Sequence, residues 1–252
     1  MFLAIDVGNT NIVFAVCDDR KIISTSRCIT ESKQDASFYH LFISKWLENE
    51  GIALQAIKNV VYASVVPMID KVIDDLAEKH FKTKASNIKN CNFDLKIDIE
   101  NPTSLGSDRI AVAVGAKNKY GNGLIIIDFG TAITFDVINE QGAFVGGVVC
   151  PGVTTSLNSL QKSAALLPKG EVNKISTRIP RNIDDALKFG SFYGYIGLVK
   201  EIVLRIKSEY NKPLRVIATG GEGCVITENV DLIDNYDPNL VIDGIIEIYL
   251  KK

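Results

Sequence analysis

The stretch Leu3-Ala4-Ile5-Asp6-Val7-Gly8-Asn9-Thr10, near the start of the chain, has a second copy, Ile125-Ile126-Ile127-Asp128-Phe129-Gly130-Thr131-Ala132. Asp6 aligns with Asp128 and Gly8 with Gly130, at the same offset of 122 residues (128 minus 6 and 130 minus 8). In each copy an apolar strand ends in an Asp-x-Gly turn and a second apolar strand follows. Buried strands draw on few residue types, so such copies can arise by coincidence. The shared Asp-x-Gly pair favours duplication.

A third strand is expected in each copy, at residues 22–29 and 143–150, and helices and strands alternate after it. Apolar side chains recur near helical spacing in residues 38–47, 69–81, 184–210 and 240–250, and runs typical of buried strands occupy residues 59–66 and 214–218. Three strands followed by alternating helices and strands, twice, predict a duplicated α/β fold. Because Lys, Asn and Gly cluster in residues 117–123, we expect one domain at 1–118 and another at 119–252.

The composition excludes several classes of protein. The net charge is −2 and no run of Lys or Arg forms a basic stripe, so nucleic-acid binding is not expected. The apolar runs fall well short of the roughly 20 residues that span a bilayer, and residues 1–5 lack the basic segment of a signal peptide. The five cysteines are scattered without a CxxC pair and only two histidines are present, which argues against a disulfide framework or a zinc site. We therefore expect a cytoplasmic protein with no membrane partner.

The Asp-x-Gly turns are candidates for phosphate binding. A carboxylate at the end of an apolar strand is costly unless it is paired or solvated. Glycine two residues later allows a positive φ and close approach to a ligand, and consecutive amide groups in such a turn form an anion site. Asp and Gly are also ordinary turn formers, which is the alternative for each copy alone. The further turn Thr219-Gly220-Gly221 favours a nucleotide site.

A second candidate site is Gly106-Ser107-Asp108-Arg109, directly before a helical run at residues 110–116. These residues suit the N-terminal cap of a helix, and for Ser107 capping is the simpler interpretation. A carboxylate beside a guanidinium can also address a hydroxyl and a carboxylate on one small molecule.

These motifs, taken in order, resemble those of the type III pantothenate kinases from residue 2 to the end of the chain. The matching stretches are Asp6-Val7-Gly8-Asn9-Thr10, Ala63-Ser64-Val65-Val66-Pro67, Gly106-Ser107-Asp108-Arg109, Asp128-Phe129-Gly130-Thr131, Gly146-Gly147-Val148-Val149-Cys150-Pro151-Gly152, Thr219-Gly220-Gly221 and Asp237-Pro238-Asn239-Leu240. The resemblance implies two related ribonuclease H-like domains of the actin-like ATPase and sugar kinase superfamily, with an ATP cleft between them. It also implies ATP-dependent phosphorylation of pantothenate to 4′-phosphopantothenate, the first step of coenzyme A biosynthesis, by a homodimer.

The same resemblance assigns roles to individual residues. Asp108 is the expected general base, and Asp128 is expected to bind a monovalent cation, K⁺ or NH₄⁺. Asp6 is expected to help place Mg²⁺ through water. ATP is expected to contact Asp6, Val7, Gly8, Asn9, Thr10, Asn11, Ile12, Val13 and Thr131. Pantothenate is expected to contact Gly106, Ser107, Asp108 and Arg109.

Two positions depart from the family pattern. Ile99 occupies a position where the family often has a Tyr that touches substrate, and Ile183 one where it commonly has a Thr. An isoleucine side chain offers no hydrogen bond, so substrate binding could be weaker or the substrate different. A kinase of the same superfamily that acts on another small acid or a sugar is one alternative. A non-catalytic nucleotide-binding regulator is another.

Overall fold

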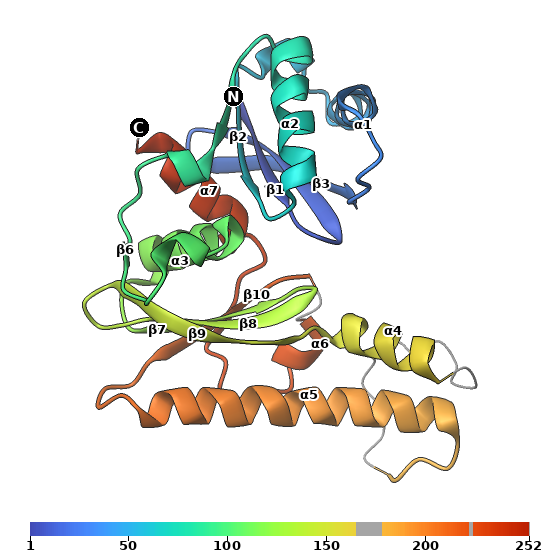
Figure 1. The fold of residues 1–252 in the computed structure, drawn as a ribbon, viewed down its shortest axis with the longest axis vertical. Helices are drawn as coiled ribbons and strands as arrows, with labels where there is room; N and C mark the ends of the chain where they lie inside the picture. The colour runs from blue at the N-terminus through green and yellow to red at the C-terminus, as the bar shows by residue number, and fades with distance from the viewer. Residues whose placement is uncertain (165–177, 222–223, 252) are drawn as a thin grey trace. The chain divides into compact units, whose positions relative to one another are not determined.

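Residues 1–164, 178–221 and 224–251 are described by the computed structural model of the chain (Figure 1). They form two compact units, each built on one β-sheet. The first unit comprises Met1–Lys96, Glu100–Lys119 and Asn239–Lys252, and the second comprises Ile97–Ile99 and Tyr120–Pro238. The C-terminal segment is therefore grouped with the first unit, while the division at residues 118 and 119 stays a prediction.

The sheet of the first unit has the strand order β3-β2-β1-β4-β5. Its strands are β1 (Phe2–Val7), β2 (Asn11–Asp18), β3 (Lys21–Ile29), β4 (Asn59–Ser64) and β5 (Ala85–Asn87). The first three form an antiparallel meander, and β4 pairs parallel with β1. The carboxyl ends of β1 and β4 therefore lie side by side, which is where open α/β sheets bind ligands.

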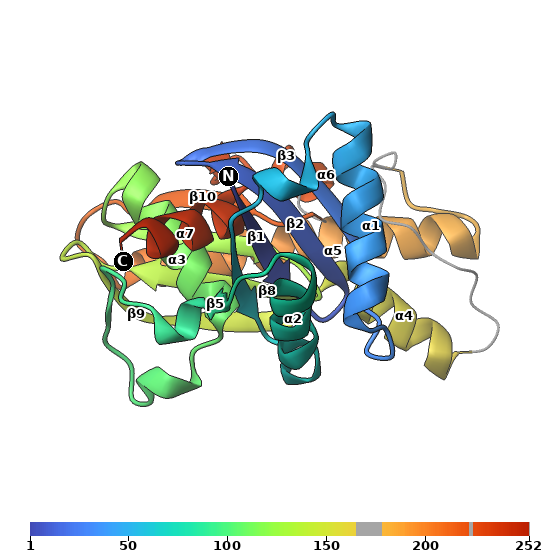
Figure 2. The same cartoon turned by 90° about the horizontal axis from the view of Figure 1, so that it is seen from above.

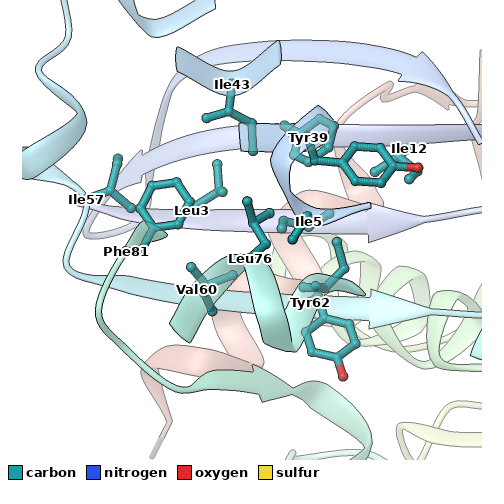
Figure 3. Packing of buried hydrophobic residues seen from close by; sticks show 14 of the residues in the cluster. Leu3, Ile5, Ile12, Tyr39, Ile43, Ile57, Val60, Tyr62, Leu76 and Phe81 are labelled. Atoms are coloured by element: carbon teal, nitrogen blue, oxygen red, sulfur yellow. The ribbon is translucent and has the colours of Figure 1, made fainter. Parts of the chain in front are cut away.

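Alternation along β1 divides its side chains between the two faces of the sheet. Leu3, Ile5 and Val7 enter a core that also contains side chains of α1 (Ala36–Asn49) and α2 (Pro67–His80), as Figure 3 shows in part. Both helices thus cover the same face (Figure 2). Asp35 caps α1 by accepting a hydrogen bond from the Phe38 amide, and Pro67 begins α2, where its missing N–H costs nothing. Asp6 is left on the opposite face.

Two further helices complete the first unit, α3 (Ser107–Tyr120) and α7 (Leu240–Leu250). They touch backbone to backbone, because a Cβ on Gly244 would overlap the Ala111 carbonyl and one on Gly115 would overlap the Leu240 carbonyl. Glu247 of α7 is buried and pairs with Arg20, at 2.9 Å between Nε and Oε1. The glycine contact sets the distance between these helices, so it also fixes where α3 lies within this unit. Short 3₁₀ helices occupy Leu54–Ala56, Ile88–Asn90 and Pro102–Ser104.

The sheet of the second unit has the strand order β11-β10-β7-β8-β9-β6. Its strands are β6 (Lys96–Ile97), β7 (Leu124–Phe129), β8 (Ala132–Ile138), β9 (Ala143–Pro151), β10 (Arg215–Thr219) and β11 (Asn235–Tyr236). The helices are α4 (Val153–Ser163), the long α5 (Ile183–Ser208) and the single-turn α6 (Cys224–Thr227). Ile125, Ile127 and Phe129 of β7 pack into a core with α4 and α5. Asp128, which alternates with them, is on the other face.

Apart from β6, which extends only the second sheet beside β9, the two sheets share one topology, which confirms the predicted duplicated α/β fold. In each, a three-stranded antiparallel meander is extended by parallel strands next to its first strand. The turns differ by one residue: residues 8–11 connect the last paired residues of β1 and β2, whereas residues 130–132 connect those of β7 and β8. Within the described parts of the chain, no helix combines the length and the apolarity needed to cross a bilayer.

Candidate active site

The Asp-x-Gly turn of the first unit is held by hydrogen bonds to its own backbone. The Gly8 amide donates to the Asn11 carbonyl at 3.0 Å, and a Cβ on Gly8 would approach that oxygen to 3.0 Å. Thr30, just after β3, donates its hydroxyl to the Gly8 carbonyl at 2.7 Å and its amide to the Thr10 carbonyl at 2.9 Å. Asn9 is exposed. The carbonyls of Gly8 and Thr10 are therefore held by Thr30, while the exposed Asn9 is accessible to a ligand.

The corresponding turn of the second unit is braced by the chain after β9. The Gly152 amide and the Thr155 hydroxyl both donate to the Thr131 carbonyl, at 3.0 and 2.7 Å. Gly152 lies so close to the Gly130 and Thr131 carbonyls that any Cβ there would overlap them. The side chain of Thr131 is exposed.

Tyr195 of α5 fixes the segment after β9 that braces the Thr131 turn. Its hydroxyl lies 2.7 Å from the Ser156 hydroxyl and 3.1 Å from each of the Pro151 and Gly152 carbonyls. One phenol thus ties α5 to the end of β9 and the first turn of α4. The position of Thr131 consequently depends on a residue 64 positions away in sequence (195 minus 131). No local sequence pattern predicts this dependence.

The Gly106–Arg109 stretch forms the first turn of α3. The Ser107 side chain is fully buried, and its hydroxyl donates to the Ser64 carbonyl at 2.6 Å and accepts from the Ser64 amide at 2.9 Å. β5 pairs with β4 only as far as Tyr62, so Ser107 takes the place of a strand neighbour at Ser64. The single Ser107 proton is committed to this contact.

Asp108 and Arg109 follow on the partly exposed surface of α3. An Asp108 carboxylate oxygen, Oδ1, accepts from the Arg109 amide at 2.7 Å, an arrangement that also suits an acid in the first turn of a helix. A Cβ on Gly106 would come within 2.5 Å of that oxygen. Glycine at 106 thus gives the Asp108 carboxylate room to lie close to the backbone.

Within the first unit, both candidate stretches attach to one strand end. Val7 pairs with Ser64 in the β1–β4 ladder, and the Val65 amide donates to the Val7 carbonyl at 3.1 Å. Ser107 is bonded to the same Ser64. The structure therefore brings the turn that follows Asp6 and the start of α3 to adjoining positions at the carboxyl ends of parallel strands. Asp128 and Thr131 belong to the second unit.

Asp128 and Asp6 have different neighbours on the adjacent strands of their sheets. Its register partners are Thr134 on β8 and Thr219 on β10, whereas those of Asp6 are Val13 and Ala63. Gly220 has φ +93°, and a Cβ on it would overlap Oδ1 of Asp128. The hydroxyl oxygens of Thr134 and Thr219 are buried and have no hydrogen-bond partner among the described residues. The sequence pattern placed Thr219 in a candidate nucleotide turn and did not single out Thr134. It linked neither threonine to Asp128, because that relation exists only through strand pairing.

The two isoleucines that depart from the family pattern lie in different settings. Ile99 is half-buried. Ile183 begins α5 directly after Asn182, which caps the helix by accepting from the Asp185 amide at 2.9 Å, and its side chain is 54% exposed. An exposed isoleucine here is free to contact a ligand but can offer it only apolar surface.

Comparison with known proteins assigns the chain to a family. The model of the family described as type III pantothenate kinase matches residues 2–205. A protein named type III pantothenate kinase, from Ruegeria sp. (strain TM1040), is 38% identical over 251 residues, covering 99% of this chain and 96% of the relative. The chain belongs to the type III pantothenate kinase family.

Solved structures agree with the fold of this type III pantothenate kinase family member. A Campylobacter jejuni protein, whose name places it in the Baf family of transcriptional activators, has a TM-score of 0.63 at 21% identity, covering 99% of this chain and 98% of its own. An activator of 2-hydroxyisocaproyl-CoA dehydratase from Clostridium difficile, with bound ADPNP, has a TM-score of 0.58 at 14% identity, covering 99% and 93%. At these identities the likeness shows the fold alone, the actin-like ATPase fold.

The residues present fit the ions that a kinase of this family is expected to use. Across the described ranges, no three His, Cys, Asp or Glu side chains gather into a site for a directly ligated metal. Asp6 is a single carboxylate, and its register partners are apolar. This setting suits Mg²⁺ that keeps most of its waters and is held chiefly by nucleotide phosphates. One carboxylate with neighbouring hydroxyl oxygens, as at Asp128, fits an ion of single charge.

Proposed function

We propose that this chain transfers the γ-phosphoryl group of ATP to the 4′-hydroxyl of pantothenate, giving ADP and 4′-phosphopantothenate, the first step of coenzyme A biosynthesis. The observation that carries the proposal is the junction at Ser64, where the turn after Asp6 and the α3 start with Asp108 meet within one unit. Family membership supports pantothenate as the acceptor, because the matching relative is named for that activity.

The proposed nucleotide contacts are the turn residues of the first unit, among which the Gly8 amide is already bonded to the Asn11 carbonyl, together with Thr131 of the second. Amide N–H groups of a tight turn are suited to phosphate oxygens. The set is Asp6, Val7, Gly8, Asn9, Thr10, Asn11, Ile12, Val13 and Thr131. The bracing of both turns, by Thr30 and by Gly152, supports this role because a preorganised turn loses little entropy when it binds.

Asp108 is the proposed general base. A free aspartate, with a pKa near 3.9, is a weak base toward an alcohol. Phosphoryl transfer passes through a loose transition state, so the hydroxyl need not lose its proton early. Asp108 orients the pantothenate hydroxyl toward the γ-phosphorus and accepts its proton as the new O–P bond forms and the bond to ADP breaks.

Arg109 is the proposed partner of the pantothenate carboxylate, since a guanidinium can make two parallel hydrogen bonds to it. Gly106 and the backbone of Ser107 complete this proposed substrate contact, because the Ser107 hydroxyl is already bonded to Ser64.

Two ions complete the proposal. Mg²⁺ enters with ATP, and Asp6 orients its waters. A monovalent cation, K⁺ or NH₄⁺, binds at Asp128, where it offsets negative charge. The close approach of Gly220 to the Asp128 carboxylate supports a site shaped around that group.

We also propose that the chain acts in the cytoplasm, where ATP is plentiful, and as a homodimer through the second unit. Val149 of β9, Leu160 of α4 and Ile183 of α5 expose large apolar side chains, and Val149 is 59% exposed. Apolar side chains of this kind are typical of protein interfaces when they are contiguous. Sedimentation of the purified chain measures its oligomeric state directly.

The activity is tested by ADP release from purified protein given ATP, Mg²⁺ and pantothenate in potassium, ammonium or sodium salts. We expect release that depends on pantothenate and is faster in K⁺ or NH₄⁺ than in Na⁺. Asp108→Asn keeps the size of the side chain and removes the charge, so turnover should fall by at least about 100-fold while the protein stays folded. Near-normal turnover of that variant rules out Asp108 as the base. ATP binding without turnover favours a nucleotide-binding regulator.

A further inference from the structure

The duplication provides an internal comparison between two aspartates. Asp6 and Asp128 occupy the same place in equivalent sheets, each on the first strand of the meander and on the face away from the helical core. Both neighbours of Asp6 in the sheet are apolar, Val13 and Ala63. Both neighbours of Asp128 carry hydroxyls, Thr134 and Thr219.

Strand geometry places these two threonine side chains on the same face of the sheet as the Asp128 carboxylate, one on either side of it. Register partners on adjacent strands project to the same face, with Cβ atoms about 4.5–5.5 Å apart. Asp128 is the central member of the row, between β8 and β10. The shorter turn of the second unit contributes to this arrangement, because it brings Thr134 opposite Asp128.

The burial of the hydroxyls indicates that they serve a ligand. Thr219 is 1% exposed, yet its hydroxyl oxygen has no hydrogen-bond partner among the described residues, and the buried oxygen of Thr134 has none either. Buried polar groups in proteins are nearly always satisfied, so each exception requires an explanation. Two such exceptions flank one carboxylate, and the apolar neighbours of Asp6 show that the fold itself does not require threonine there.

We propose that the hydroxyl oxygens of Thr134 and Thr219 coordinate, together with Asp128, the monovalent cation of the proposed function, on which this inference rests. Hydroxyl and carboxylate oxygens are ligands for hard cations. The row contributes one negative charge and two neutral oxygens, which suits a singly charged ion. Gly220, next to Thr219, lies so close to the Asp128 carboxylate that a Cβ on it would overlap Oδ1. These threonines are thus determinants of cation affinity and need not touch ATP or pantothenate.

Thr219→Val and Thr134→Val test the inference, because valine keeps the β-branched shape and removes only the hydroxyl. Thr219→Ser keeps the hydroxyl and is the rescue variant. Thr25→Val on β3, in the other sheet, is the matched control. The primary readout is the midpoint of thermal unfolding, followed by circular dichroism, in KCl, NaCl and choline chloride of equal ionic strength. The second readout is the K⁺ concentration that half-activates ADP release.

We expect KCl to raise the unfolding midpoint of the wild-type protein, of Thr219→Ser and of Thr25→Val above its value in choline chloride. Each threonine-to-valine change at 134 or 219 should abolish most of that rise. In choline chloride the same two variants should be at least as stable as the wild type, because an unpaired buried hydroxyl has been removed. Half-activation should require about two- to tenfold more K⁺ for each lost hydroxyl.

The outcomes separate the inference from the function on which it rests. If the wild type shows a K⁺-specific rise that Asp128→Asn abolishes and both valine variants retain, the threonines are not ligands and the inference fails while the cation site stands. If the wild type shows no difference between KCl and choline chloride, the cation site itself fails and the inference falls with it. A loss of stability of Thr219→Val in choline chloride also contradicts the inference, because it means that the hydroxyl is paired within the protein.

Discussion

Ser107→Ala should destabilise the first unit by several times the usual effect of a serine substitution. Removing the Ser107 hydroxyl leaves both the amide and the carbonyl of Ser64 without the partners found at 2.9 and 2.6 Å. Ser107 is fully buried and Ser64 is 5% exposed, so water cannot easily replace the lost hydroxyl. At about 1–3 kcal/mol for each of the two unsatisfied buried groups, the expected loss is about 2–6 kcal/mol.

The assay can be confined to the first unit. The chain has one tryptophan, Trp46, and it packs in the core of that unit at 8% exposure. Urea unfolding followed by Trp46 fluorescence therefore reports on the unit that contains Ser107, and an unchanged slope with urea shows that the same surface is exposed on unfolding.

Ser104→Ala is the matched control, because it removes an exposed hydroxyl that donates to the Asn101 carbonyl at 2.7 Å in the turn just before α3. Its expected cost is below about 0.5 kcal/mol, since water can replace a bond at the surface. If Ser107→Ala lies within about 0.5 kcal/mol of the wild type, the junction at Ser64 does not depend on this hydroxyl. The structural role assigned to Ser107 is then wrong.

Three further predictions concern other parts of the chain. Gly106→Ala places a Cβ within 2.5 Å of the Asp108 carboxylate, so kcat should fall by about 100-fold while the KM for ATP is unchanged. Gly190→Ala is the control, because a Cβ there meets nothing, and it should leave both constants unchanged. Equal effects of the two substitutions would contradict this prediction. Tyr195→Phe removes the hydroxyl that holds the first turn of α4, which in turn bonds the Thr131 carbonyl. The KM for ATP should therefore rise about three- to tenfold, a larger change than the fall in kcat. Tyr193→Phe on the same helix is the control. Burial and the stacked His80 ring lower the pKa of His40 below 6.5, so the unfolded chain binds that proton more readily. The contribution of this site to the stability of the first unit should therefore be fully present above pH 6.5 and be lost as the pH falls from 6.5 through the lowered pKa of His40. His40→Gln should flatten the decline, measured by the urea midpoint of Trp46 fluorescence.

Much of the fold could be predicted from local pattern. The expected helix at 240–250 coincides with α7, the expected 184–210 with α5 at Ile183–Ser208, and the two meanders with β1–β3 and β7–β9. These elements are predictable because apolar periodicity and turn residues act over short distances along the chain. The return of α7 to the first unit was not predicted, because it depends on the contact of Gly244 with α3.

The candidate site could be predicted in part. The Asp-x-Gly turns and the Gly106–Arg109 stretch are visible as sequence because their residues are contiguous. What surrounds them is not contiguous: Ser107 depends on Ser64, Thr131 on Gly152 and Tyr195, and Asp128 on threonines of two other strands. Strand register and helix packing determine these contacts, and neither can be predicted from a single segment of the sequence.

The most direct test of the central claim is identification of the product that forms from ATP and pantothenate in the presence of Mg²⁺ and K⁺. We predict that ³¹P NMR will show 4′-phosphopantothenate accumulating in step with ADP, and that both will form at least about 100-fold more slowly when Asp108→Asn replaces the wild type. ADP that forms at the same rate without pantothenate, or bound ATP that is never turned over, would contradict the assignment of this chain as a pantothenate kinase.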